Sequence, residues 1–302
     1  STGTDKLVLL AGDDMRYYRT RGADGLRLLA RGDTDTYDLT SANPNVQAFE
    51  DLAYVADVND RSVDDVATDL LGSADTVSVP EDAAVEIPVL VDEVWAAGVT
   101  YEISEQAREA ESGMPEMYLD VYGAERPEVF FKATWDRVVG PGEPVGVRGD
   151  SEWNVPEPEL GVVLYEGDIV GYTVGNDVSS RSIEGENPLY LPQAKIYDRC
   201  CALGPCVATP DSVSDPHDLT MTMTVTRDGE HVYDGVTSTT EMVRSCEELV
   251  SYYCRHNSVP ESVVLLTGTS LVPDEGFSLR PGDEVRIDIE GIGRLVNGVV
   301  SV

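Results

Sequence analysis

The sequence predicts an α+β protein that is mainly β, in which a small α/β unit precedes a larger unit built from strands. Residues 219–226 alternate strictly between apolar and polar side chains, which is the pattern of a half-buried strand. Asp228 and Gly229 follow directly and are typical of a hairpin turn. In the second half only residues 240–255 carry apolar side chains at helical spacing, so strands dominate there.

The boundary between the two units is expected near residue 88. Pro80 and Pro88 bracket an acidic stretch that interrupts regular structure. We therefore expect a small N-terminal domain at 1–88 and a second domain at 89–302. A chain of 302 residues is long enough to build two unequal cores.

Two helices are expected in the N-terminal unit, over residues 46–55 and 62–71. Ser62 is placed to cap the second helix, because its hydroxyl can accept a hydrogen bond from a free backbone N–H of the first turn. Asp64 and Asp65 follow in that turn, where negative charge is favoured by the helix dipole.

The chain is strongly acidic, since 56 Asp and Glu against 21 Lys and Arg give a formal net charge of −35. Such a charge repels polyphosphate, and the sequence has no basic patch, which excludes nucleic acid as a partner. Lysine occurs only at Lys6, Lys132 and Lys195. Because salt screens self-repulsion, we interpret this composition as halophilic, with a simply acidic protein as the alternative.

Nothing in the sequence points to a membrane or to an oxidising compartment. No apolar run approaches the roughly 18 residues that a membrane helix needs, and residues 1–12 lack the basic start of a signal peptide. The five cysteines match no zinc pattern, so we expect reduced, buried thiols. We therefore expect a cytoplasmic protein with no membrane partner.

Acidic side chains converge on a predicted hairpin. Glu157 and Glu159 are two residues apart in its first strand, so they share a face. If the loop is the three residues 166–168, Asp177 in the second strand lies opposite Glu157, with about 5 Å between the Cβ atoms. A two-residue loop would shift the register by one residue and turn Asp177 to the other face.

Three carboxylates on one face repel one another unless they are solvated, protonated or bridged by a cation. Hard oxygen ligands suit Mg²⁺, so Glu157, Glu159 and Asp177 form a candidate metal site. Acidic residues are common throughout this chain, and a solvated acidic face is the alternative interpretation.

Separated segments between residues 90 and 300 resemble the fumarylacetoacetate hydrolase superfamily. In order, they are 98–101 (Gly-Val-Thr-Tyr), 129–132 (Val-Phe-Phe-Lys), 156–160 (Pro-Glu-Pro-Glu-Leu), 171–181 (Gly-Tyr-Thr-Val-Gly-Asn-Asp-Val-Ser-Ser-Arg), 195–198 (Lys-Ile-Tyr-Asp), 203–205 (Leu-Gly-Pro), 267–269 (Thr-Gly-Thr) and 279–283 (Leu-Arg-Pro-Gly-Asp). The run at 171–181 is the most specific. The resemblance implies a mixed β-roll or sandwich catalytic domain behind a small N-terminal α/β domain, and a homo-oligomer (a dimer or tetramer).

The resemblance also implies roles for individual residues. Glu157, Glu159 and Asp177 fall on the positions that hold Mg²⁺ or Mn²⁺. Arg181 falls on the arginine that helps to hold a 2-oxo-acid carboxylate. Lys195 falls on a lysine beside the metal that assists proton transfer, and a structural ion pair with the carboxylates is its alternative role. An amine suits proton transfer because its pKa can be lowered, and a nearby Mg²⁺ would lower it.

Three further positions are expected to contact substrate. Thr269 belongs to the Thr-Gly-Thr turn that lines the family site. Lys132 is assigned to substrate binding, with a purely structural role as the alternative. Glu184 stands where the family has Gln, a departure that would change substrate contacts.

The segment after residue 98 departs from the hydrolase members. Their lid carries a His and a Glu that activate water, but Ser104 and Ala107 stand at those places here and neither can act as a base. The segment resembles instead the branch of sugar-acid dehydratases. Glu105 is therefore the candidate catalytic lid residue for proton transfer at C4 and C5, with Glu102 beside it; solvated lid acids are the alternative.

The expected activity is Mg²⁺-dependent dehydration of a 2-keto-3-deoxy-pentonate to 2,5-dioxopentanoate in oxidative pentose degradation. The partner is thus a small 2-oxo sugar acid, derived from arabinonate or xylonate, and the sequence leaves that choice open. An acylpyruvate-type C–C hydrolase or an oxaloacetate decarboxylase on the same fold is the nearest alternative. A non-catalytic acidic oligomer or metal-binding module is the alternative of another class.

Overall fold

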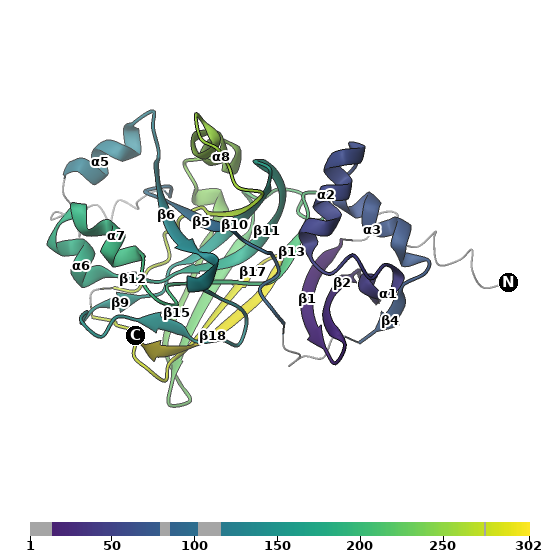
Figure 1. Ribbon diagram of the computed structural model, residues 1–302. Helices are drawn as coiled ribbons and strands as arrows, with labels where there is room; N and C mark the ends of the chain where they lie inside the picture. The colour runs from purple at the N-terminus through teal and green to yellow at the C-terminus, as the bar shows by residue number, and fades with distance from the viewer. Residues whose placement is uncertain (1–13, 79–84, 102–115, 275) are drawn as a thin grey trace.

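The computed structural model describes residues 14–78, 85–101, 116–274 and 276–302. Within these residues the chain forms one large mixed sheet, a second sheet of five strands and a two-stranded pair (Figure 1). The mainly β fold that the sequence predicts is therefore confirmed.

The large sheet has eleven strands in the described part of the chain. In spatial order they are β4 (Asp75–Val77), β3 (Thr36–Asp38), β2 (Gly25–Arg31), β1 (Arg16–Gly22), β13 (Cys201–Ala208), β11 (Asp168–Asp177), β10 (Pro158–Tyr165), β16 (Ser262–Leu266), β5 (Glu93–Gly98) and β6 (Glu128–Thr134), with β7 (Val138–Val139) beside β13. Neighbours are antiparallel except β16 with β5 and β13 with β7.

The five-stranded sheet has the order β15 (Glu230–Ser238), β14 (Thr220–Arg227), β17 (Glu284–Ile289), β18 (Gly293–Ser301) and β8 (Val145–Val147). The two-stranded pair joins β12 (Ser179–Ser180) to β9 (Asn154–Val155). The α-helices are α1 (Leu39–Ala42), α2 (Phe49–Asn59), α3 (Val63–Leu71), α5 (Glu116–Gly123), α6 (Arg181–Glu186), α7 (Leu191–Lys195) and α8 (Cys246–Cys254). Short 3₁₀ segments cover Trp135–Arg137, Pro188–Tyr190 and Thr239–Glu241. None of the helices in the described segments is both long and apolar enough to cross a bilayer.

The N-terminal helices lie beside β1–β4, on the right of Figure 1. Helix α3 begins as predicted, because the Ser62 hydroxyl accepts a hydrogen bond from the Asp65 N–H at 3.1 Å. Helix α2 begins three residues later than predicted. The Asp51 carboxylate accepts hydrogen bonds from the backbone N–H groups of Gln47 and Ala48, which fixes the start of the helix at Phe49.

The large sheet continues from the N-terminal unit into the rest of the chain. Strand β1 pairs with β13, with Tyr17 opposite Val207. The Tyr17 and Thr209 hydroxyls both donate to the Asp64 carboxylate of α3 at 2.7 Å. Strands on both sides of residue 88 thus share one sheet, and the domain boundary predicted there stays a prediction.

The hairpin of β14 and β15 confirms the alternation in the sequence. Met221, Met223 and Val225 are fully buried on one face. Asp228 and Gly229 form the turn with φ of 52° and 83°, the left-handed pair that a type I′ turn requires.

The helix expected over residues 240–255 is shorter than predicted. Only Cys246–Cys254 is helical, and the Ser245 hydroxyl caps it by accepting from the Glu248 N–H. The preceding backbone is held elsewhere, because Met242 forms a β-bridge with Tyr101 and the Val243 N–H donates to the Thr100 carbonyl. Tertiary pairing has replaced the first turns of the helix.

Strand β10 is an inner strand of the large sheet and lies between β11 and β16. All eight of its residues are buried, because both faces of the sheet are covered. Leu160, Val162 and Leu164 contribute to one apolar cluster, whereas Val163 and Tyr165 contribute to the other. Side chains at the start of this strand are therefore held on a rigid support.

Candidate active site

The hairpin of β10 and β11 places Glu157 opposite Asp177, as the sequence predicts, but with a different loop length and a bulge. The Asp177 N–H donates to the Glu157 carbonyl at 2.9 Å, and Glu159 pairs with Gly175. The predicted three-residue loop is wrong, since Tyr165 pairs with Asp168.

A β-bulge restores the register that the shorter loop would lose. The loop is Glu166 and Gly167, both with positive φ. Ile169 pairs with Leu164 but Gly171 pairs with Val163, so Val170 is an extra residue on β11. That one residue returns Asp177 to the face of the two glutamates.

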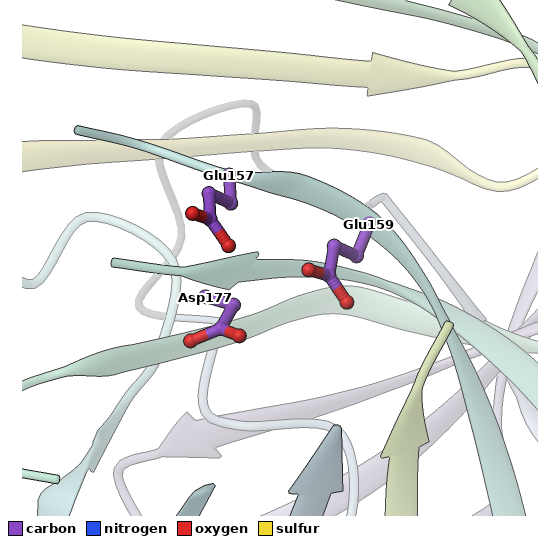
Figure 2. Close-up of side chains that lie close together, drawn as sticks. All are labelled: Glu157, Glu159 and Asp177. Carbon is purple, nitrogen blue, oxygen red and sulfur yellow. The ribbon is translucent and has the colours of Figure 1, made fainter. Parts of the chain in front are cut away.

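The three carboxylates converge as a buried cluster, which we call the acid trio (Figure 2). Glu157, Glu159 and Asp177 are only 6%, 2% and 1% exposed. One carboxylate oxygen from each lies within 4.8 Å of the other two. A solvated acidic face is therefore excluded for these residues, and protonation or a cation must offset their repulsion.

Two lysines contact the acid trio. Lys195 at the end of α7 lies 2.5 Å from Glu157 Oε2 and 3.0 Å from Asp177 Oδ2. Lys132 of β6 lies 2.6 Å from Asp177 Oδ1. Burial alone raises the pKa of Asp177, but the two ammonium groups outweigh it and hold that pKa below its usual range.

Glu159 is the member of the trio that no ammonium group contacts among the described residues. Its Oε2 accepts a hydrogen bond from the Gly268 N–H at 2.7 Å. Burial, followed by the charges of Asp177 and Glu157, raises the pKa of Glu159 well above its usual value. A divalent cation would relieve this carboxylate, and hard oxygen donors at this spacing fit Mg²⁺ or Mn²⁺.

Lys195 holds its proton firmly among the protein's own groups. Burial lowers its pKa, but Asp177 and Glu157 more than compensate and raise it well above the usual value. The lowered pKa expected from the sequence depended on a metal ion, and the side-chain contacts alone act in the opposite direction.

Lys132 contacts the trio at Asp177 and is fully buried. Its ammonium group also donates to the carbonyl oxygens of Val178, at 2.9 Å, and Lys195, at 2.6 Å. These contacts with three protein oxygens favour the structural role that the sequence left open over contact with substrate.

Arg181 and Glu184 flank the trio on α6. An Arg181 Nη2 hydrogen donates to Glu157 Oε1 at 2.9 Å, and Nη1 lies 3.6 Å from Glu184 Oε2. The Ser179 hydroxyl donates to the same Glu184 oxygen at 3.2 Å. Both side chains keep some exposure, so they can meet a ligand at the rim of the trio.

Thr269 lies next to the backbone that holds Glu159. Its hydroxyl accepts from the Leu271 N–H at 3.0 Å, and the residue is half-buried. Gly268 has φ of +82°, and a Cβ there would collide with the Thr100 hydroxyl. Glycine is therefore required for the N–H to reach Glu159.

The predicted lid acids cannot be placed. Glu102, Ser104, Glu105 and Ala107 lie outside the described residues. Their roles stay predictions.

One carboxyl beside the trio was missed in the sequence. Glu128 begins β6, and Lys195, Glu184, Glu157 and Asp177 all act electrostatically on its carboxyl group. No periodic signal in the sequence could have found it, because Lys132 is an extra residue in the pairing of β6 with β5, and this bulge interrupts the period of two between Glu128 and Lys132.

Comparison with known proteins agrees with this geometry. Residues 93–300 match the family described as fumarylacetoacetate (FAA) hydrolase, C-terminal. A probable 2-keto-3-deoxyxylonate dehydratase of Haloferax volcanii is 63% identical over 95% of this chain and 100% of its own. The 2-dehydro-3-deoxy-D-arabinonate dehydratase of Saccharolobus solfataricus is 44% identical over 72% of this chain and 75% of its own.

A solved structure extends the comparison to the fold. A 2-keto-3-deoxy-D-arabinonate dehydratase complexed with magnesium and 2,5-dioxopentanoate superposes with a TM-score of 0.80 and 35% identity, covering 95% of this chain and 99% of that one. The family match alone spans more than half of the sequence. The chain therefore belongs to the fumarylacetoacetate hydrolase family, as its motifs indicated.

Proposed function

We propose that this chain dehydrates a 2-keto-3-deoxy-pentonate, derived from xylonate or arabinonate, to 2,5-dioxopentanoate with the help of Mg²⁺. The observation that carries the proposal is the buried acid trio with Lys195 between two of its members. Relatives 63% and 44% identical that are named as such dehydratases support the choice of reaction.

Glu157, Glu159 and Asp177 would hold Mg²⁺, or Mn²⁺ in its place. The bound ion supplies Lewis-acid polarisation of the 2-oxo-acid group, which acidifies the C3 protons. Lys132 keeps Asp177 oriented from behind through its 2.6 Å contact. Burial of the trio keeps bulk water away from these charges and strengthens their action on a ligand.

Lys195 moves the proton at C3 in this proposal. Its amine is the proton-bearing group that touches two members of the trio. Arg181 orients the substrate carboxylate or a neighbouring oxygen, since a guanidinium group can donate two parallel hydrogen bonds. Glu184 and Thr269 face the hydroxyl groups of the substrate, and a carboxylate at position 184 accepts from a hydroxyl where Gln would also donate.

Glu105, with Glu102 beside it, remains the lid candidate for proton transfer at C4 and C5. We further propose that the enzyme is a salt-adapted, cytoplasmic homo-oligomer that acts in oxidative pentose degradation. The net charge of −35 and the relative from Haloferax volcanii support the salt adaptation.

A product assay tests the proposal. Purified protein in molar KCl is treated with EDTA and given 2-keto-3-deoxy-xylonate or 2-keto-3-deoxy-arabinonate, with and without added Mg²⁺, and the aldehyde is followed by NMR. We expect 2,5-dioxopentanoate only when Mg²⁺ is restored. Release of pyruvate from an acylpyruvate, or of CO₂ from oxaloacetate, without any dehydration would contradict the proposal.

A matched variant tests the role of Lys195. Lys195→Arg keeps a cation near the carboxylates but cannot release a proton. We expect it to lower kcat by roughly 10² to 10⁴-fold, the usual contribution of general acid–base catalysis. A near-normal kcat would remove Lys195 from the chemistry.

A further inference from the structure

A cavity of about 360 Å³ lies at the N-terminal unit, where residues of β1, β2 and the start of α2 line it. These elements are on the right of Figure 1, whereas α6 and α7, which flank the acid trio, are on the left. The volume falls within the range of small-molecule sites, roughly 300–1,000 Å³. The lining combines a guanidinium group, two amides, a carboxylate and apolar side chains, and it includes Arg19, Asn45, Gln47, Asp51, Leu26 and Leu90.

Arg19 supplies the positive charge of this cavity. Arg21 of the same strand pairs with Glu86 at 2.7 Å, whereas Arg19 forms no ion pair within the described part of the chain. The Arg19 Nε atom is buried and has no hydrogen-bond partner among those residues. Its Nη1 atom makes a long contact, 3.4 Å, with the Ile87 carbonyl oxygen. Because a buried donor without an acceptor is costly, this guanidinium group is suited to bind an anionic group of a ligand.

The acid on which the charge of Arg19 acts is a weak counter-charge. That acid is Glu50, and burial raises its pKa, which favours the neutral form. The Glu50 Oε1 atom is already engaged, since it accepts hydrogen bonds from the Leu90 N–H at 2.6 Å and from the Ser262 hydroxyl at 3.1 Å. The charge of Arg19 therefore remains available to a carboxylate that enters the cavity.

The rest of the lining suits hydroxyl groups better than a bare inorganic anion. Asp51 Oδ2 accepts from the backbone N–H groups of Gln47 and Ala48, at 2.8 and 2.9 Å, and its Oδ1 can accept from a ligand. Gln47 Nε2 donates to the Pro44 carbonyl at 2.9 Å, so its Oε1 can also accept. The Asp51 carboxylate repels phosphate or chloride but accepts from a hydroxyl group. Leu90, which is 49% exposed, offers an apolar wall to a carbon chain.

We propose that this cavity is a second ligand site, which binds a small hydroxy carboxylate. The guanidinium group of Arg19 donates to the carboxylate of the ligand. Gln47 and Asp51 accept from its hydroxyl groups, and Leu90 contacts its carbon chain. The inference goes beyond the proposed dehydration, because the lining contains neither the three carboxylates of the acid trio nor the lysines that contact them.

Binding of D-xylonate, a hydroxy carboxylate, tests the site. EDTA-treated protein in molar KCl is titrated by calorimetry, so that long-range charge attraction is screened and no metal ion assists binding. We expect saturable binding of one D-xylonate per chain. Xylitol has hydroxyl groups but no carboxylate, and acetate has a carboxylate but no hydroxyl groups, so both should bind more weakly. Equal affinity for xylitol or acetate, or no binding of D-xylonate, would overturn the inference.

Three matched arginine variants locate the bound ligand. Arg19→Met should weaken D-xylonate binding by at least about tenfold, which is the usual contribution of a charge-assisted hydrogen bond. Arg21→Met, on the same strand, and Arg181→Met, at the rim of the acid trio, should keep the affinity within about twofold of wild type. A loss in Arg181→Met but not in Arg19→Met would place the ligand at the trio and contradict the inference.

A fourth variant keeps the test decisive if Arg19→Met does not fold. Gln47→Ala changes an exposed side chain and removes one acceptor for a hydroxyl group. We expect it to weaken D-xylonate binding by at least about threefold, with an unchanged circular dichroism spectrum. Wild-type affinity in a folded Gln47→Ala variant would contradict the assigned contact. All of these experiments measure binding and not turnover, so their failure is distinguishable from failure of the proposed dehydration.

Discussion

The acid trio and Glu50 of the N-terminal unit both bury carboxylates, and they hold them in different ways. In the acid trio, Asp177 and Glu157 are held by ammonium and guanidinium groups, and among the described residues Glu159 accepts only a backbone N–H. In the N-terminal unit, Glu50 accepts from the Leu90 N–H at 2.6 Å and from the Ser262 hydroxyl at 3.1 Å. Both of these donors to Glu50 are neutral, whereas Asp38 of the same unit is paired with Arg27 at 2.6 Å.

Asp64 of the N-terminal unit is also held by neutral donors, unlike Asp177 and Glu157. Its oxygens accept from the hydroxyls of Tyr17 and Thr209, so each oxygen has a neutral partner. Burial raises the pKa of Asp64 and of Glu50, and the charges of Asp211 and Asp65 raise that of Asp64 further. Among the described residues, only the trio brings one oxygen from each of three carboxylates within 4.8 Å. Burial of an acid therefore does not by itself indicate a site. Convergence of several acids on one point does.

The largest expected effect comes from removing one charge of the trio. Glu159→Gln preserves size but lacks a carboxylate, so it should weaken metal binding. Lewis-acid stabilisation is worth several kcal/mol, so we expect a fall of at least about 10³-fold in kcat/KM. Glu50→Gln is the matched control from the other region and should keep its activity. Equal activity of the two variants would contradict the prediction that the trio, but not Glu50, binds the metal.

The next effect concerns the ammonium groups that contact the trio. Lys132→Met removes one member of a fully buried ion pair and leaves Asp177 with Lys195 alone. We expect a loss of about 3–5 kcal/mol in the free energy of unfolding, measured by denaturant titration in molar KCl. A stable Lys132→Met variant with a raised KM would instead support the substrate contact first expected for this lysine.

A smaller effect is expected at Asp64. Asp64→Ala leaves the Tyr17 and Thr209 hydroxyls without their acceptor, at a cost of about 2 kcal/mol in the free energy of unfolding. The rate constant kcat should stay near the wild-type value, because Asp64 lies outside the trio. A loss of kcat with full stability would show that the two regions are coupled.

The smallest effect depends on pH. Because burial raises the pKa of Glu50, the folded state holds this proton more tightly than the unfolded state. Its stabilising contribution is present below the unfolded pKa near 4.3 and is lost as pH rises through the folded pKa. From pH 4 to pH 7, the stability of Glu50→Gln relative to wild type should therefore rise. A flat or falling difference would contradict the raised pKa.

Local features of the fold were predictable because neighbouring residues alone determine them. The turn at Asp228 and Gly229 and the Ser62 cap are of this kind. The bulge at Val170 was not predictable. Its extra residue restores the register that the two-residue loop shifts, and the local sequence does not decide between a loop of two residues and one of three. The helix expected from 240 fails for a similar reason, because pairing of Met242 with distant Tyr101 decides that backbone.

The acid trio was predictable from spacing and motif, but the roles of the residues around it depend on how deeply each side chain is buried. Nothing in the sequence says that Lys132 is fully buried whereas Arg181 stays partly exposed. Glu128 was missed because one acid among 56 carries no local signal. Its position beside the trio depends on the pairing of β6 with β5, which places Glu128 opposite Gly98.

The most direct measurement is the binding of Mn²⁺, followed by electron paramagnetic resonance, to EDTA-treated wild type and Glu159→Gln in molar KCl. We predict one tightly bound ion per chain in wild type, displaced by Mg²⁺, and at least tenfold weaker binding in the variant. Wild-type affinity in Glu159→Gln, with the fold intact by circular dichroism, would contradict a metal held by the three carboxylates.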